Sequence, residues 1–157
     1  MGTNVTLYEQ DFYAWTQEQA ALLREGAVQD LDVGNLAAEV EGLGARDHRE
    51  LRRRLGRLVT HLLKWQYQPA GRQTGHSWWA TIRTQRQEIA DLLEQSPSLR
   101  RTVPEALRGR YALARDHASA QTHLPLAIFP ATCPWTPAQV LDADFWPGED
   151  GDTAALP

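Results

Sequence analysis

The sequence predicts an all-α protein: a single-domain bundle of four to five helices, followed by a proline-rich C-terminal strap with one short helix. Apolar residues recur at intervals of three and four along most of the chain, which is the spacing of one face of an α-helix. The chain lacks runs of alternating β-branched residues joined by Asn-Gly or Asp-Gly turns, the usual signal for strands. With 157 residues, 42 % apolar and 23 % charged, it has the size and composition of one globular domain.

The first predicted helix begins after Asp11, whose carboxylate can accept from an amide of the first turn, and it ends at Gly26. A second helix is predicted to begin at Asp32. Its apolar face is formed by Leu36, Val40 and Leu43. Gly42 and Gly44 each disfavour a helix by about 1 kcal/mol relative to alanine. The sequence leaves open whether they break this helix or only bend it.

The strongest helical pattern runs over residues 46–67. Its apolar residues step by four, three, four and three: Leu51, Leu55, Leu58, Leu62 and Trp65. A further helix is predicted from His76 or Ser77, with Ser77 the better cap, to the Ser96-Pro97 break. A fourth long helix is predicted over residues 104–120, with Pro104 in its first turn.

The strap follows Thr122, where prolines become frequent. Thr136 and Pro137 together form a helix-start signal, which predicts one short helix through Leu141. Phe145 and Trp146 are expected to pin the strap to the helices. We therefore expect one domain over residues 1–147 and a flexible acidic tail over residues 148–157.

Charge and cysteine content limit the classes of function. The net charge of −4 argues against a general binder of nucleic acid or anionic membranes. Cys133 is the only cysteine, so a reducing, cytoplasmic location is expected. The longest apolar run, residues 124–131, is too short to span a bilayer, and the N-terminus has no secretory signal pattern, so no membrane association is expected.

Familiar catalytic and metal-binding motifs are missing. The five histidines do not form H-E-x-x-H or E-x-x-H patterns, and none of the serines lies in a G-x-S-x-G motif. The single lysine, Lys64, does not follow a glycine-rich phosphate loop. We therefore expect no metal and no cofactor, and the balance favours a protein that is not an enzyme.

A cluster of polar residues near the expected apolar faces is the main candidate site. It comprises Glu39, Glu41, His61, Arg83 and Arg86. Packing of the helices could bring these groups together, and half-buried charges are costly unless they are paired. One interpretation is a structural network that fixes helix register; the alternative is a ligand or active site.

Two other features have competing interpretations. Six arginines crowd residues 46–57, with Glu50 placed to pair with Arg53 or Arg54, which is typical of a solvated helix face. The alternative is a surface for nucleic acid. Trp78 and Trp79 are adjacent, so one of them could stay near the surface and mark a dimer or partner contact, while a broad buried face would use both.

Several ordered motifs resemble a known family. They are Leu7–Trp15 (LYEQDFYAW), His61–Pro69 (HLLKWQYQP), Ser77-Trp78 with Thr81–Arg83 and Gln85-Arg86, Ser96–Leu99 (SPSL) and Phe129–Trp135 (FPATCPW). Together they look like domain-of-unknown-function family 29, small bacterial and especially cyanobacterial proteins. The resemblance covers residues 7–147 and implies an all-helical fold. It implies no activity, and it carries over no catalytic residues.

The leading functional hypothesis is a non-enzymatic, cytoplasmic helical protein-interaction module whose partner is unknown and which could form a homodimer. One alternative is an enzyme or small-ligand binder that uses Glu39, His61 and Arg86. The other is a nucleic-acid-associated protein that uses the arginine face of residues 46–57, against which the negative net charge and the lack of a familiar binding fold both argue.

Overall fold

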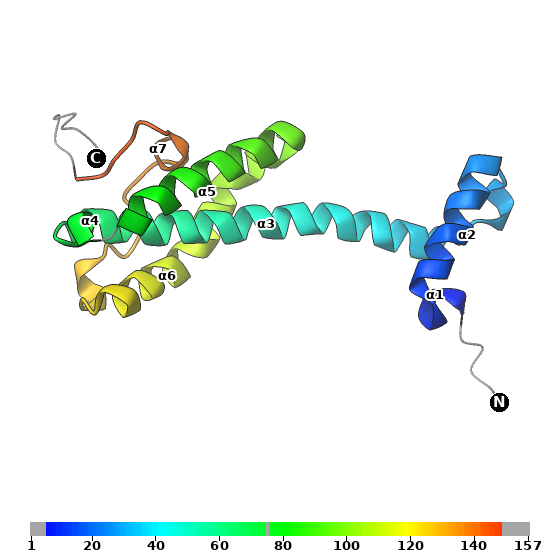
Figure 1. Ribbon diagram of the computed structural model, residues 1–157, viewed down its shortest axis with the longest axis horizontal. Helices are drawn as coiled ribbons and strands as arrows, with labels where there is room; N and C mark the ends of the chain where they lie inside the picture. Colours follow the sequence, from blue (N-terminus) through cyan, green and yellow to red (C-terminus); the bar gives the residue numbers. More distant parts are fainter. Residues whose placement is uncertain (1–5, 75, 149–157) are drawn as a thin grey trace. The chain divides into compact units, whose positions relative to one another are not determined.

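The computed structural model describes residues 6–74 and 76–148 of the chain. Within these residues every regular element is helical, which confirms the predicted all-α class. The long helices are α2 (Phe12–Glu25), α3 (Val33–Tyr67), α5 (His76–Gln95) and α6 (Val103–Thr122) (Figure 1). The short helices are α1 (Leu7–Gln10), α4 (Gly71–Thr74) and α7 (Pro137–Leu141), and 3-10 turns lie at Val28–Asp30, Pro97–Thr102 and Leu126–Ile128.

The chain divides into two compact units, residues 1–46 and residues 47–157. The first unit, called here the N-terminal unit, holds α1, α2 and residues 33–46 of α3. The second, the helical core unit, holds the rest of α3 together with α4 to α7. The single domain expected over residues 1–147 stays a prediction, and the expected tail lies outside the described residues except for Gly148.

Helix α3 continues through both of its central glycines. The helices predicted from Asp32 and over residues 46–67 are one continuous helix, and neither Gly42 nor Gly44 breaks it. A Cβ atom at either position would meet nothing within 4 Å, so neither glycine is needed for a close contact. The penalty of about 1 kcal/mol for each glycine is small compared with the free energy gained when the apolar residues that follow in α3 are buried.

The core of the second unit forms around the predicted stripe of α3. Leu51, Leu55, Leu58 and Leu62 are fully buried, and Trp65 is 5 % exposed, which confirms the prediction from spacing. The same core includes residues from α5 and α6: Ile82, Ile89, Leu93, Leu107, Tyr111, Ala114 and Ala118. The two alanines on α6 leave room for close packing because they carry only a methyl group.

Helix ends follow local signals, with one correction. The Asp11 carboxylate accepts from the Ala14 amide at 2.9 Å, and Gly26 ends α2 in the left-handed conformation with φ of 72°. Ser77 lies inside α5, which begins at His76, so the prediction of Ser77 as a cap is wrong. Helix α6 continues to Thr122, two residues beyond the predicted end.

The strap, residues 123–147, is held to α6 and α5 by side chains that donate to its backbone carbonyls. Tyr111 donates to Pro130 at 2.6 Å, and Ser119 donates to Leu124 at 2.7 Å. Arg115 donates to the carbonyls of Phe129 at 3.0 Å and Leu126 at 3.1 Å. Phe145 and Trp146 pack against the core as expected, and Thr136 caps α7.

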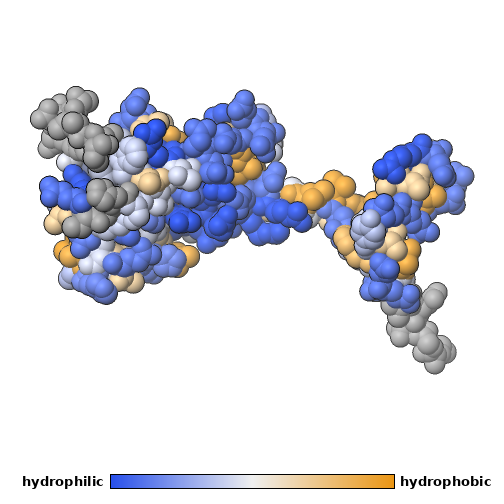
Figure 2. Space-filling view, viewed as in Figure 1, coloured by the Kyte–Doolittle hydropathy of each residue, from blue (hydrophilic) through white to orange (hydrophobic). Residues whose placement is uncertain are grey.

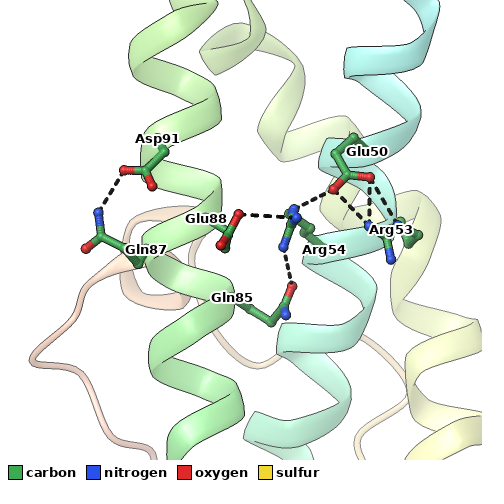
Figure 3. A network of polar contacts seen from close by, with 7 residues as sticks. All are labelled: Glu50, Arg53, Arg54, Gln85, Gln87, Glu88 and Asp91. Atoms are coloured by element: carbon green, nitrogen blue, oxygen red, sulfur yellow. Dashed lines mark hydrogen bonds and ion pairs between the residues drawn. The ribbon is translucent and has the colours of Figure 1, made fainter.

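A polar network links α3 to α5 on the surface of the helical core unit (Figure 3). Arg54 on α3 contacts Glu50 at 2.7 Å and reaches Glu88 on α5 at 3.3 Å. It also donates to Gln85 at 3.4 Å. Hydrogen bonds from Arg53, together with the nearby charge of Arg54, lower the pKa of Glu50. Glu50 thus pairs with both Arg53 and Arg54, as the spacing predicted, while the interpretation of the whole arginine stretch as a solvated face stays a prediction.

Candidate functional site

Of the five residues predicted as a polar cluster, Glu39 and Glu41 lie in the N-terminal unit. The Glu39 carboxylate accepts a hydrogen bond from the Tyr8 hydroxyl. This bond is the main cause of the raised pKa of Tyr8. Glu41 is exposed. Glu39 therefore ties α1 to α3, whereas Glu41 is on the surface.

His61 lies on α3 in the helical core unit. Its Nδ1 is 2.8 Å from the backbone carbonyl of Arg57, one turn earlier. Because a carbonyl oxygen only accepts, the proton of the neutral ring is on Nδ1. Burial lowers the pKa of His61 below its ordinary value. His61 is thus a half-buried, neutral imidazole at neutral pH.

Arg86 is the buried cation of the predicted cluster, with only 4 % of its surface exposed. Its Nε donates to the carbonyl of Val140 at 2.9 Å, and its Nη2 donates to that of Gln139 at 3.4 Å. Its Nη1 is buried without a partner. Burial lowers the pKa of Arg86 to about 10, so the group is still charged at neutral pH.

Arg83 is exposed and lies over the ring of Trp79, 4.7 Å from its centroid. Arg83 and Arg86 line one hollow of about 510 Å³, together with Asp144 and Trp146. Glu39, His61, Arg83 and Arg86 thus each contact different groups, Glu41 is exposed, and of the five residues only the two arginines line a common hollow. Sequence reasoning could not find the partners of Arg86, because they are backbone carbonyls more than fifty residues away.

Trp78 and Trp79 are both half-buried and pack against the core. Lys64 Nζ lies 4.6 Å from the centre of the Trp78 ring and donates to Gln121 at 3.0 Å. Burial lowers the pKa of Lys64. The indole nitrogen of Trp79 is buried without a partner. The pair is therefore shared between core and surface, and its contact with a partner stays a prediction.

A second hollow, which the sequence reasoning missed, lies between α3 and α6. It has a volume of about 400 Å³, and we call it the α3–α6 groove. Its lining residues are Arg53, Gly56, Arg57, Thr60, His61, Arg110, Leu113, Ala114, His117 and Gln121. One sequence pattern points to this groove. On α6, one face is formed by residues three or four positions apart: Arg110, Ala114, His117 and Gln121. This face meets the face of α3 that carries Arg53 and Arg57.

The N-terminal unit is organised around Asp32. Its carboxylate accepts from the Trp15 indole at 3.0 Å and from the Asn35 amide at 2.8 Å, and its backbone amide donates to Gln19 at 2.8 Å. The bond from Asn35 is the main reason that the pKa of Asp32 is lowered. Of the described residues in this unit, only Trp15 and Gln19 are buried.

Large apolar side chains are exposed on the same unit, where Figure 2 shows hydrophobic surface. They are Leu7, Phe12, Tyr13, Leu23, Val28, Val33, Val40 and Leu43. Val40 is 66 % exposed and Leu43 is 57 % exposed, whereas the sequence predicted an apolar helix face turned toward a core. An apolar stripe without a covering element is typical of an interaction surface.

The part of the chain that the structure describes holds no group of three histidine, cysteine or acidic residues suited to a metal ion. Among the described helices, none combines the length and hydrophobicity needed to cross a bilayer.

Comparison with known proteins identifies one relationship. No curated protein and no solved structure matches the chain. One family model, described as a domain of unknown function, DUF29, matches residues 7–146. Its description carries no activity, so function has to be argued from the residues themselves.

Proposed function

The chain belongs to the DUF29 family of unknown function, and we propose that it is a helical protein-interaction module that pairs with a second copy of itself. The observation that carries the proposal is the exposed stripe at the start of α3. Val33, Val40 and Leu43 are 63 %, 66 % and 57 % exposed. A cytoplasmic setting in a bacterium fits the single cysteine, Cys133, and the family resemblance.

The spacing of the stripe favours a two-stranded partner. Val33, Leu36, Val40 and Leu43 step by three, four and three, so they occupy alternate core positions of two heptads. Valine at the first core position with leucine at the second favours pairs of helices over trimers or tetramers. The next two core positions are Asp47 and Glu50, which end the stripe after two heptads.

The magnitude of burial sets the expected strength. Covering three half-exposed side chains on each copy is worth on the order of 1 kcal/mol per side chain, or about 6 kcal/mol. That lies near the lower end of the cost of association, about 4–15 kcal/mol. We therefore expect the exposed aromatic residues of α2, Phe12 and Tyr13, to join the interface. At about 2 kcal/mol per ring, these four rings add about 8 kcal/mol, which brings the dissociation constant to about the micromolar range when the cost of association is near its lower end.

The test is sedimentation velocity of the full chain from low to high micromolar concentration. The wild-type chain is expected to dimerise, and Val40→Glu is expected to stay monomeric because it places a charge in the seam. Ala38→Glu is the matched control: it adds the same charge to the same helix, on the side away from the stripe. Circular dichroism of each variant checks that the helices are retained.

Two outcomes would overturn the proposal. One is a wild-type chain that is monomeric throughout the concentration range, even if it binds some other protein. The other is a dimer that Ala38→Glu weakens as much as Val40→Glu. As an independent readout, Val40→Cys in a Cys133→Ser background should form an oxidised dimer, whereas Ala38→Cys in the same background should not.

A further inference from the structure

The α3–α6 groove has a small-residue floor and walls from two helices. Gly56 on α3 allows Arg110 on α6 to lie across it, with side-chain carbons 3.8 Å from where a Gly56 Cβ would stand. The hydroxyl of Thr60 donates to the Gly56 carbonyl at 2.9 Å and lies 3.4 Å from the Ala114 carbonyl. The groove of about 400 Å³ therefore has a floor of buried residues, Thr60 and Ala114, and walls formed by two helices.

The charge of the groove is positive and only partly compensated. Arg53, Arg57 and Arg110 line it, and no aspartate or glutamate is among its lining residues. Arg53 forms a bidentate pair with Glu50, at 2.8 and 3.1 Å. Within the described residues, Arg57 and Arg110 have no ion pair, and the Nε of Arg110 is buried without an acceptor. Two guanidinium groups thus face this groove with no carboxylate of the described chain to pair them.

Other arginines of the same unit are used differently. Arg54 bridges two carboxylates, Arg86 donates to carbonyls of α7, and Arg115 donates to carbonyls of the strap. Arginine forks bind carboxylates, phosphates and carbonyls because their donors lie in one plane. Among the described residues, exposed arginines such as Arg108 also lack an ion pair, but Arg57 and Arg110 differ from them because they line one hollow, where the Nε of Arg110 is buried.

The remaining lining residues add donors and an apolar wall. Gln121 accepts from Lys64 through its oxygen at 3.0 Å, which leaves its amide hydrogens free to donate. His61 and His117 line the groove from opposite helices. Leu113 is 45 % exposed, and it offers apolar surface beside the cations. This combination suits an anion that carries an organic group.

We propose that the α3–α6 groove binds a phosphate monoester of a small organic molecule, with the phosphoryl oxygens on Arg57 and Arg110 and the organic group against Leu113. A small ligand is favoured over a nucleic acid because the unpaired cations converge on one hollow. Nucleic acids instead need cations spread along a surface to match successive phosphates. The chain's net charge of −4 also opposes a polyanion.

The experiment is nuclear magnetic resonance of the ¹⁵N-labelled full chain, titrated with phenyl phosphate, inorganic phosphate or chloride at constant ionic strength. Saturable shifts are expected for amides of residues 53–61 and 110–121, with phenyl phosphate binding several-fold more tightly than inorganic phosphate because it also covers Leu113. Arg57→Gln and Arg110→Gln are each expected to lower the affinity for phenyl phosphate by about tenfold. Arg110→Lys should recover part of the loss because it restores the charge without the fork.

Arg108→Gln is the matched control, since Arg108 is exposed on α6 and lies outside the groove. The affinity of Arg108→Gln for phenyl phosphate should stay within about twofold of the wild-type value. Equal shifts with chloride, or an equal loss in Arg108→Gln, would mean general charge attraction and would overturn the proposal. If Arg110→Gln does not fold, the affinity of Arg57→Gln for phenyl phosphate tests the proposal, because Arg57 is exposed. A 12-nucleotide RNA is the last probe. If the chain bound this RNA more tightly than phenyl phosphate, and Arg108→Gln weakened RNA binding as much as Arg57→Gln does, the ligand would be a polyanion and the proposal would be wrong.

Discussion

The Nε of Arg86 on α5 donates to the backbone carbonyl of Val140 on α7 at 2.9 Å, across 54 residues of sequence. A second bond, from Nη2 to Gln139, is longer at 3.4 Å. Both acceptors lie in the last turn of α7, where the Gln139 carbonyl also accepts from the Asp142 amide at 3.3 Å and the Val140 carbonyl has Arg86 as its donor. A buried cation thus satisfies the end of a short helix and fixes the strap on α5.

Replacement of Arg86 by methionine should loosen the strap. Arg86→Met keeps much of the side-chain volume but leaves the carbonyl of Val140 without its donor and removes the longer bond to Gln139. We expect the free energy of unfolding to fall by about 2–4 kcal/mol, measured by urea denaturation. Arg83→Met is the control on the exposed side of the same helix and should change stability by less than about 0.5 kcal/mol. Equal effects of the two substitutions would contradict the assigned role.

Acid should weaken the N-terminal unit through Asp32. The folded pKa of this carboxyl lies below its unfolded value of about 3.9, so the stability it contributes is present above that pH and is lost as pH falls through the folded pKa. The protection factors of amides in residues 12–46, which are exchange rates corrected for the intrinsic pH dependence of exchange, should therefore fall on acidification below about pH 4. Asp32→Asn should remove this dependence, whereas Asp30→Asn, at an exposed site, should preserve it.

Two glycines in the helical core unit should respond oppositely to alanine. A methyl group at Gly71 would overlap the ring of Trp78, whose other contacts include Lys64. Gly71→Ala should therefore lower the free energy of unfolding by about 1–3 kcal/mol. Gly56→Ala adds a methyl group in a helix interior, 3.8 Å from the side chain of Arg110. This substitution should raise the free energy of unfolding by about 0.5–1 kcal/mol. Thermal denaturation of both variants checks the signs; a neutral Gly71→Ala would show that the Trp78 contact is not tight.

Anion affinity in the groove should rise as pH falls, because His61 gains a proton. Burial is the main cause of its lowered pKa, and the charges of Lys64 and Arg57 on its own helix act in the same direction. Arg53 is a further cation on the same helix, and Arg110 and His117 line the groove from α6. The midpoint of the rise should lie below pH 6.5, the ordinary histidine value.

Sulfate is the suitable probe for this effect, because a phosphate monoester itself changes charge near pH 6. Sulfate affinity should increase about five- to tenfold between pH 8 and pH 5. His61→Gln should remove most of the increase. An unchanged pH profile in His61→Gln would assign the effect to another group.

Local signals in the sequence predicted most of the helical core unit. The stripe from Leu51 to Trp65 and the start of α7 at Thr136 depend on residues within a few positions of one another, so a linear pattern contains them. The same reasoning could have found α1, because Thr6 and Glu9 form a capping box that is visible in the sequence. Spacing alone could not tell that Val40 and Leu43 are exposed, because a core face and an exposed seam share one pattern.

The candidate sites depend on packing between distant residues, which the linear pattern does not contain. Arg86 flanks an apolar arc in the sequence, and its burial becomes understandable only with the carbonyls of α7 in place. The α3–α6 groove needs Arg57 and Arg110 from two different helices, and the spacing of Arg110 with Ala114, His117 and Gln121 does not show which face of α3 these residues meet. Residues that act through long-range pairing are therefore the ones that the prediction missed.

The strap's attachment through carbonyl oxygens has an evolutionary consequence. Arg86, Tyr111, Arg115 and Ser119 bind main-chain atoms that every amino acid supplies, so much of the strap can change sequence without losing its anchors. Selection on this region then falls on the donors of two helices and on the strap's buried side chains, such as Phe129 and Val140, whereas its exposed positions are free to diversify along the same path.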